Sequence, residues 1–378
     1  MPVSPEDLVA RVRAAMAVAG LNQQSLAQAI GLDPTALSKA LSGNRNFKSL
    51  EVALIAERLG VSVQSLLSET TTPVTLVAAR AQPDVNLAVD QALAKANSHL
   101  DLDALLTDLG MGSEASLGDD PPRLGSDHRQ GEELSAQVRV AMGIGDDDLP
   151  YDLSALAGLL ERRLGVDVGF EPLPEGLDGL SVARGGFRLA LVSSGISATR
   201  QRFTLAHEIG HLAAGDSQDL HVDESVFGRK TPDETRANAF AASFLMPAAA
   251  IRESVPHGQV SEEVVAGLLS RFGVSLDALA FRLHNVGVVD AAGRDHIRSM
   301  SSNRIALRSG RASDLQARGD RRVPGNLLQR TIEAYARAKI SVRPLADLLS
   351  VPPEQLLAEL TPARRNLPEG DGSMEPAL

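Results

Sequence analysis

Two histidines and a glutamate stand at a spacing that suits a catalytic metal ion. The segment HEIGH, from His207 to His211, is an HExxH motif. Because residues four apart lie on one face of a helix, both imidazoles can point at a single ion. Glu208 then lies about 100° round the helix axis, close to a water on that ion. Zinc lowers the pKa of such a water toward about 7, so that Glu208 can take its proton as the water attacks a carbonyl. The motif predicts metal-dependent peptide hydrolysis, the alternative being two histidines packed beside an acid.

A catalytic zinc ion needs a third protein ligand. The 378-residue chain has no cysteine, so this ligand must be His, Asp or Glu. The metzincin pattern is excluded, because it requires glycine and histidine where the chain has Ala214 and Ser217. A thermolysin-like arrangement fits Glu234, and Asn238, one turn later, can hold a metal-binding imidazole from outside the ligand set. Two other residues are alternative ligands, Asp233 and His221.

The sequence leaves open which side chain would stabilise an oxyanion. Thermolysin-like enzymes place a histidine or a tyrosine for this purpose. Both tyrosines of the chain, Tyr151 and Tyr335, lie far from the motif in sequence. Four basic residues remain as candidates, each of which can equally be structural: His221, His257, Arg200 and Arg202.

Apolar periodicity predicts the elements that must position these residues. Helices are expected over 200–214 and 234–245, the second one stopped by Pro247. Alternating patterns predict three strands, over 165–170, 180–182 and 187–192. The last of these strands either accepts a substrate strand at a sheet edge or lies in the core.

Two blocks around the metal motif resemble the ImmA/IrrE family of zinc metallopeptidases. They read RFTLAHEIGH (202–211) and ANAFAASFLMP (237–247), in the family's order, and the likeness covers roughly 132–247. The resemblance implies Zn²⁺ held by His207, His211 and Glu234, with Glu208 as the general base. Members of this family cut helix-turn-helix repressors and so release stress or mobile-element genes. The resemblance thus implies a protein substrate of that class.

Residues 1–68 are predicted to form a compact set of helices, with Asp33 as a helix N-cap and Pro34 at the first helical position. The stretches LNQQSLA (21–27), GLDPTALSK (31–39), SGN (42–44) and GVSV (60–63) resemble the XRE, or lambda-repressor-like, helix-turn-helix family. In such domains one helix contacts phosphate and the next enters the major groove. The resemblance implies phosphate contacts from Gln23 or Gln24, Arg45 and Lys48, and a base-facing set of Pro34, Thr35, Ala36 and Lys39.

Charge limits how this domain can bind DNA. The whole chain carries −11, which argues against a protein that coats nucleic acid. Residues 1–68 hold six basic and five acidic side chains, and a net charge of +1 gives little phosphate affinity to a single copy. Either a homodimer supplies the second half-site on an operator, or the module binds protein instead.

The expected fold class is α+β and predominantly helical: a lambda-repressor-like helix-turn-helix bundle, a zincin-like metallopeptidase domain with a small sheet, and a helical C-terminal region. A helix-turn-helix pattern recurs at 268–283 and 345–360. The chain divides into five segments: 1–68, the DNA-binding domain; 69–131, a helical segment and flexible linker; 132–250, the metallopeptidase domain; 251–300, a helix-turn-helix-like extension; and 301–378, a helical region with a disordered tail.

No apolar run approaches the roughly 20 residues of a membrane span, and the N-terminus lacks the core of a signal peptide. We therefore expect a cytoplasmic protein with no membrane partner. The leading hypothesis is a DNA-binding transcriptional regulator with a zinc metalloendopeptidase domain that cleaves a helix-turn-helix repressor. An alternative keeps the fold without proteolysis, as a metal- or ligand-sensing repressor or antitoxin-like regulator. A third is a protease whose N-terminal module docks its substrate.

Overall fold

A computed structural model describes most of the chain in separate stretches. The described residues are 5–18, 21–59, 66, 83–113, 125–216, 221–222, 231–255, 260–308 and 320–360. The predicted disordered tail and His257 lie outside them, as does much of the predicted linker. The fold is α+β and predominantly helical, as expected.

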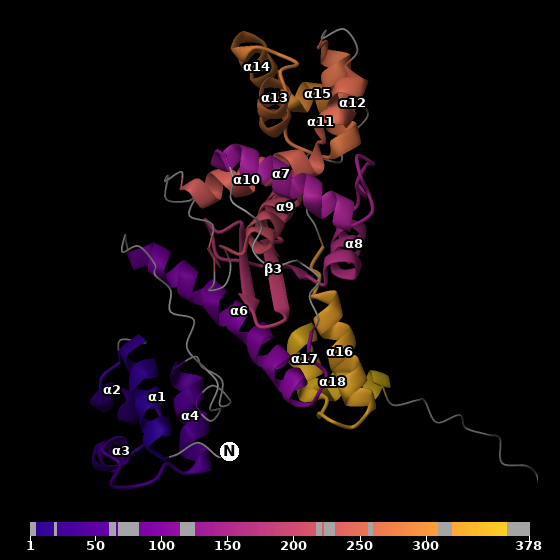
Figure 1. The fold of residues 1–378 in the computed structure, drawn as a ribbon. Coiled ribbons are helices and arrows are strands. Elements are labelled where there is room, and N and C mark those ends of the chain that lie inside the picture. The colour runs from indigo at the N-terminus through magenta and orange to yellow at the C-terminus, as the bar shows by residue number, and fades with distance from the viewer. Residues whose placement is uncertain are drawn as a thin grey trace, which may run out of the picture.

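The N-terminal part is a helical bundle (Figure 1, indigo). Its helices are α1 (Pro5–Val18), α2 (Gln23–Ala29), α3 (Pro34–Leu41) and α4 (Ser49–Leu59). Leu26, Leu37 and Ile55 are fully buried in its core. The carboxylate of Asp33 accepts hydrogen bonds from the backbone N–H groups of Thr35 and Ala36, at 2.9 and 3.1 Å. The predicted N-cap and the predicted proline at the start of α3 are confirmed.

A small sheet lies at the centre of the larger body. Within the described residues it has four strands: β1 (Asp167–Glu171), β2 (Gly179–Arg184), β3 (Phe187–Ser193) and β4 (His221–Val222). Their order is β1-β3-β2-β4, with β1 parallel to β3 and the other pairs antiparallel. The three predicted strands are confirmed. Of the two alternatives for 187–192, the core strand is confirmed and the sheet edge is not, because β3 lies between β1 and β2 and both of its sides are paired.

Helices cover this sheet. Three of them pack on it directly, α6 (Pro83–Asp108), α8 (Leu153–Leu164) and α9 (Ala198–Ala214). Two more, α7 (Asp127–Ala141) and α10 (Pro232–Leu245), pack on the outer side of α9. Figure 1 shows α9 between the sheet and the crossing pair α7 and α10. Both crossings with α10 are close because glycine stands at each. A Cβ on Gly131 of α7 would overlap the carbonyl oxygen of Arg236, and one on Gly210 of α9 would lie 3.0 Å from the ring of Phe240.

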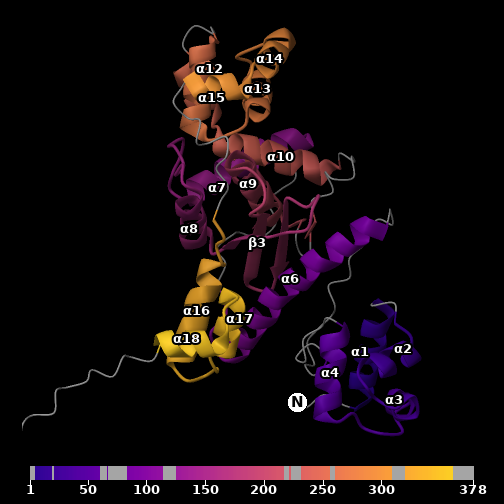
Figure 2. The same cartoon turned by 180° about the vertical axis from the view of Figure 1, so that it is seen from behind.

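A helical lobe follows α10 at one end of the body (Figure 2). It comprises α11 (Ala248–Ser254), α12 (Glu262–Phe272), α13 (Leu276–Asn285), α14 (Ala291–Arg298) and α15 (Ser302–Arg308). Arg282 attaches this lobe to the body. Its guanidinium is 2% exposed, donates to the carbonyl of Met246 at 2.9 Å, and forms an ion pair with Glu132 of α7.

The C-terminal lobe, α16 (Gly325–Ala336), α17 (Arg343–Leu349) and α18 (Pro353–Leu360), is tied to the sheet. Two carboxylates of the body accept hydrogen bonds from backbone N–H groups in the first turn of α16. Glu161 accepts from Gly325 at 2.6 Å and Asp167 accepts from Leu327 at 2.7 Å. Arg322 forms an ion pair with the same Glu161. The first N–H groups of a helix have no partner within the helix, so these hydrogen bonds satisfy them and hold the lobe against β1 and α8.

The recurring helix-turn-helix pattern is present three times among the described residues, as α2–α3, α12–α13 and α17–α18. The first residue of each turn is left-handed: Gly31, Gly273 and Ser350 have φ of +66°, +65° and +55°. The first and third turns are also closed by equivalent backbone hydrogen bonds. The Leu32 N–H donates to the Ala27 carbonyl at 2.9 Å, and the Val351 N–H donates to the Ala346 carbonyl at 3.0 Å. Helices α12 and α13 meet at 103°, an angle typical of such units.

No single helix in the described stretches has the length and apolar composition needed to cross a bilayer. The bent pair α12 and α13 reaches the required length and composition only when both helices are taken together.

The buried Asp167 predicts a pH-dependent stability. Burial raises the pKa of this fully buried carboxyl from 3.8 to about 7, although the Leu327 N–H and Arg330 oppose the shift. Since the folded pKa exceeds the unfolded one, its contribution to stability is full below about pH 4 and is lost as the pH rises to 7. Asp167→Asn still offers an oxygen to Leu327. Between pH 5 and 8, wild type should therefore lose roughly 1–3 kcal/mol more than Asp167→Asn in urea-induced unfolding. The exposed Asp320→Asn is the control, and a parallel loss in wild type and Asp167→Asn would contradict the shift.

Candidate metal centre and nucleic-acid interface

Helices α9 and α10 bring the predicted metal ligands to one place. Every residue of α9 from Thr204 to Ala214 is buried, since the helix lies between the sheet and α10. Helix α10 begins at a defined point because the Thr231 hydroxyl accepts a hydrogen bond from the Glu234 N–H at 3.2 Å and Pro232 takes the first position. Glu234 is thereby fixed in the first turn of α10, facing His207 and His211.

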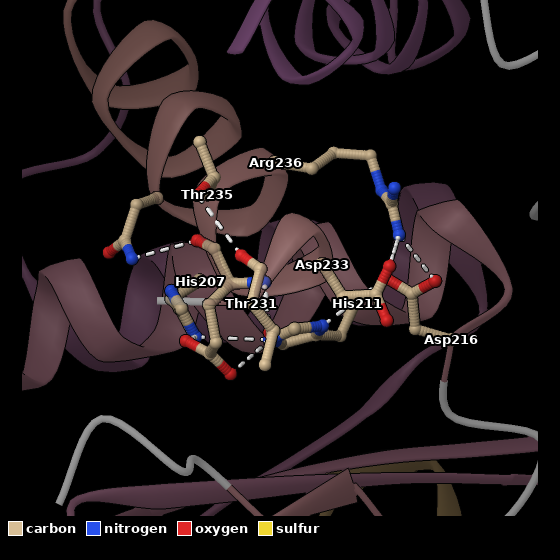
Figure 3. Close-up of polar contacts among 9 residues, drawn as sticks. His207, His211, Asp216, Thr231, Asp233, Thr235 and Arg236 are labelled. Carbon is tan, nitrogen blue, oxygen red and sulfur yellow. Dashed lines mark hydrogen bonds and ion pairs between the residues drawn. The ribbon is translucent and has the colours of Figure 1, made fainter. Parts of the chain in front are cut away.

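The three side chains converge closely (Figure 3). The Nε2 atoms of His207 and His211 lie 3.1 Å apart, and oxygens of Glu234 lie 3.3 and 3.4 Å from them. All three residues are at most 4% exposed. A tetrahedral ion with ligands at about 2.0–2.1 Å holds its donor atoms roughly 3.3 Å apart. Two imidazoles and one carboxylate at these separations therefore fit a zinc-type site with three protein ligands.

A second layer of polar residues surrounds His211. Its Nδ1 lies 3.3 Å from the Asp216 carboxylate, and Arg236 donates to both oxygens of Asp216 at 2.6 and 2.8 Å (Figure 3). Arg236 also binds Asp233 at 2.6 Å. Burial acts to raise the pKa of Asp216, but the hydrogen bonds from His211 and Arg236 outweigh it and lower the pKa. The carboxylate is thus held ionised against the outer nitrogen of a candidate metal ligand, which fixes the ring.

Sequence reasoning missed Asp216 and Arg236. Their roles depend on the end of α9, where Gly215 is left-handed with φ of +74° and turns the chain back toward His211. The signal available in the sequence was an aspartate directly after that glycine. The predicted partner Asn238 instead donates to the backbone carbonyl of Glu234 at 2.8 Å. Of the alternative ligands, Asp233 binds Arg236 and lies outside the group of His207, His211 and Glu234. His221 lies in β4.

The candidate general base Glu208 is fully buried where α9 meets the start of β2. A Cβ on Gly179 would lie only 2.8 Å from the Oε1 atom of Glu208. The strand must therefore begin with glycine to leave room for this carboxylate. Glu208 thus lies on the sheet side of the same helix that carries His207 and His211.

The candidates for oxyanion stabilisation lie in different parts of the structure and make different contacts. Arg202 is 2% exposed and donates to the carbonyls of Phe272 at 2.9 Å and Tyr151 at 3.3 Å, a packing role that also holds Tyr151. Burial lowers the pKa of Arg202 to about 10. Arg200 is exposed and forms an ion pair with Asp178, the residue before Gly179. Tyr335 lies on α16 in the C-terminal lobe.

The predicted DNA-contacting residues lie on α2, α3 and the following loop. Gln23 and Gln24 are exposed at the start of α2, and Pro34, Thr35 and Lys39 are exposed along α3, with Ala36 half-buried. Lys48 is also exposed. Arg45 is engaged within the protein, because its guanidinium donates to both oxygens of Glu51 at 3.1 and 3.0 Å. The surface of α3 is therefore open, with Lys39 as its exposed cation.

The other two helix-turn-helix units differ at the corresponding positions. In α13, Asp277 binds Arg298 of α14 at 2.7 Å, and the guanidinium groups of Arg294 and Arg298 lie over the Phe281 ring. Arginines of α14 thus engage Asp277 and Phe281 on the outer face of α13. In α18 the exposed helix carries Glu354 and Glu359, which repel phosphate. The first unit is the one suited to a nucleic acid.

Comparison with known proteins finds two matches in separate parts of the chain. A family described as the IrrE N-terminal-like domain matches residues 161–284, and a helix-turn-helix family matches residues 12–66. The chain joins an XRE-type helix-turn-helix domain to an IrrE-like domain. The IrrE-like domain holds the cluster of His207, His211 and Glu234, and the helix-turn-helix domain holds the open surface of α3.

Two curated relatives are radiation response metalloproteases named IrrE. The one from Deinococcus deserti is 36% identical over 123 residues, 29% of this chain and 39% of that protein. The one from Deinococcus radiodurans is 36% identical over 124 residues, 31% of each chain. The chain therefore spans 39% and 31% of the length of these two relatives. A solved Mycobacterium tuberculosis transcriptional regulator aligns over 50% of this chain and 51% of its own, at 16% identity and a TM-score of 0.31.

The contact between Asp216 and His211 predicts a loss of metal affinity on mutation. Asp216→Asn removes the negative charge at the outer nitrogen of His211 and should weaken Zn²⁺ binding about 10- to 100-fold. The measurement is competition with a chromophoric chelator. Asp233→Asn, which also removes a partner of Arg236 but lies outside the cluster, should change the affinity little. Equal losses in the two variants would contradict the assigned role of Asp216 and would favour Asp233 as a ligand.

Proposed function

We propose that this protein is a cytoplasmic DNA-binding transcriptional regulator whose IrrE-like domain is a zinc metalloendopeptidase. The observation that carries the proposal is the buried group of His207, His211 and Glu234, whose donor atoms are spaced as a tetrahedral ion requires. The names of the two relatives, both metalloproteases, support the same chemistry.

In this proposal His207, His211 and Glu234 hold the zinc ion, and Asp216 orients His211 through its Nδ1. Bound there, zinc would supply Lewis-acid chemistry that activates water and polarises a peptide carbonyl. Glu208 accepts the proton of the attacking water at a carboxylate oxygen and passes it to the leaving amine. Because all four residues are at most 4% exposed, the proton is kept away from bulk water.

The substrate we propose is a helix-turn-helix repressor. Support comes from the resemblance to the ImmA/IrrE family, and the fusion to a DNA-reading domain would bring the peptidase close to a repressor on neighbouring DNA. The N-terminal domain would bind an operator through α3, with Pro34, Thr35, Ala36 and Lys39 facing the bases. Its net charge of +1 favours a homodimer that reads two half-sites.

The role of Glu208 is tested by a variant that keeps the metal ligands. Glu208→Gln should bind zinc as wild type does, yet cleave a co-expressed repressor at least 100-fold more slowly, because the amide cannot accept a proton. The exposed Glu175→Gln is the matched control and should cleave normally. His207→Ala should lose both zinc and cleavage.

The substrates to test are any helix-turn-helix repressors that the neighbouring genes encode. If wild type leaves all of them intact while zinc stays bound, proteolysis of this class is ruled out and the metal-sensing regulator is favoured. If Glu208→Gln cleaves as fast as wild type, Glu208 is not the base. Fragment masses from mass spectrometry decide both points.

The DNA-binding proposal is tested at Lys39, the exposed cation of α3. Lys39→Ala should weaken binding to the protein's own promoter fragment by about 5- to 100-fold, as expected for loss of a base or phosphate contact. Gel shifts at several salt concentrations measure it. Lys339→Ala, outside the N-terminal bundle, is the control, and an equal effect of both variants would contradict the assignment of α3.

A further inference from the structure

The first residue of β2 packs against the face of α9 that carries Glu208. Thr204 and Glu208 stand four residues apart, on one face of that helix. A Cβ on Gly179 would lie 2.6 Å from Cγ2 of Thr204, 2.8 Å from Oε1 of Glu208 and 3.2 Å from its Cγ. These separations fall below the roughly 3.5–4.0 Å that suits two carbon atoms. Gly179 does not have a left-handed φ, so the lack of space is what requires glycine here.

Contacts on both sides of Gly179 hold the strand in this place. The carbonyl of the preceding residue, Asp178, accepts a hydrogen bond from the Ser193 N–H at 2.7 Å. The carboxylate of Asp178 forms an ion pair with Arg200 of α9. Gly179 itself lies opposite Val192 in the antiparallel ladder with β3. The strand therefore cannot withdraw from α9 without losing these contacts.

The Glu208 side chain is confined on the other side of this contact. It is fully buried, and α9 is buried from Thr204 to Ala214 between the sheet and α10 (Figure 1). A methyl group at position 179 would therefore have to turn or push the Glu208 carboxylate. The three atoms nearest to that methyl group belong to Thr204 and Glu208, and none belongs to a metal-cluster residue. The size of residue 179 thus acts on the carboxylate and not directly on the three candidate ligands.

We propose that Gly179 is a positioning residue for peptide hydrolysis, which keeps the Glu208 carboxylate where it can accept a proton by leaving it room against β2. The proposal rests on the proposed function, in which Glu208 is the general base. Proton transfer needs heavy atoms about 2.6–3.2 Å apart, and a misplacement of about 1 Å can slow a reaction about 100-fold. One methyl group on the sheet is therefore enough to impair a base that the HExxH helix carries.

Gly179→Ala tests the proposal in the full-length protein, on a purified helix-turn-helix repressor that wild type cleaves. We expect kcat to fall about 10- to 100-fold and KM to change less than about twofold, because the base is displaced and peptide binding is not. Zn²⁺ affinity, measured with a chromophoric chelator, should equal that of wild type. The matched control is Gly169→Ala in β1, where a Cβ would lie 2.7 Å from Cδ2 of Leu191. It crowds the same sheet at another place and should cleave as wild type does.

Glu208→Asp, which shortens the side chain by one methylene, provides a rescue. It should slow cleavage by itself, and adding Gly179→Ala should then slow it less than about twofold further, because the methyl group occupies the space that the shortening leaves. Urea unfolding should show the same coupling. Gly179→Ala should raise the unfolding constant about 5- to 100-fold in wild type, as over-packing does, and less in Glu208→Asp. Gly169→Ala should act independently of Glu208→Asp in both measurements.

If Gly179→Ala does not fold by circular dichroism, the comparison is made in a Thr204→Ser background, which removes the methyl group that also meets position 179. Unchanged kcat in folded Gly179→Ala, or effects that simply add to those of Glu208→Asp, overturns the role of Gly179 and leaves the proposed function in place. An equal loss in Gly169→Ala also overturns it. If wild type cleaves no repressor, the proposed function is wrong and the role of Gly179 in it is overturned as well.

Discussion

The candidate metal site of His207, His211 and Glu234 depends on the close approach of α10 to both α9 and α7. Glycines at positions 131 and 210 let the backbones come together, and the first turn of α10 then faces the histidines of α9. A glutamate 23 residues beyond His211 can join the two imidazoles only because the helices cross at this distance. The spacing of the three donor atoms, 3.1 to 3.4 Å, is set by that crossing.

Ion pairs with one buried member attach the remaining parts of the larger body to this core. Arg282 joins the lobe of α11–α15 to α7, and Glu161 joins the C-terminal lobe to α8. Loss of Glu132 or Arg322 would leave the buried charge of Arg282 or Glu161 without its ion-pair partner, which weakens the attachment of that lobe. In a chain with no cysteine, these charged contacts supply the long-range links, and each depends on its partner staying in place.

The sequence contained enough to predict which side chains the structure brings together as a candidate metal site. HExxH and Glu234 were recognisable because helical periodicity and capping residues are local signals, and the three strands followed from local alternation. The order of the strands was not recognisable, since pairing joins residues far apart in the chain. For that reason the choice between an edge and a core position for β3 could not be made from the sequence. Asp216 was missed because its contact with His211 depends on a left-handed turn at Gly215. The binding of α16 to Glu161 links residues more than 160 positions apart and had no local signature.

The attachment of α16 also changes what counts as a domain in this chain. The family match ends at residue 284, yet Glu161 and Asp167, both inside the match, complete their hydrogen bonds with residues 322–327. The hydrogen-bonded unit therefore extends beyond the matched segment and is discontinuous in sequence. A fragment cut at residue 284 would leave Glu161 and Asp167 without the N–H donors of Gly325 and Leu327, so the C-terminal lobe completes the interior of the matched domain.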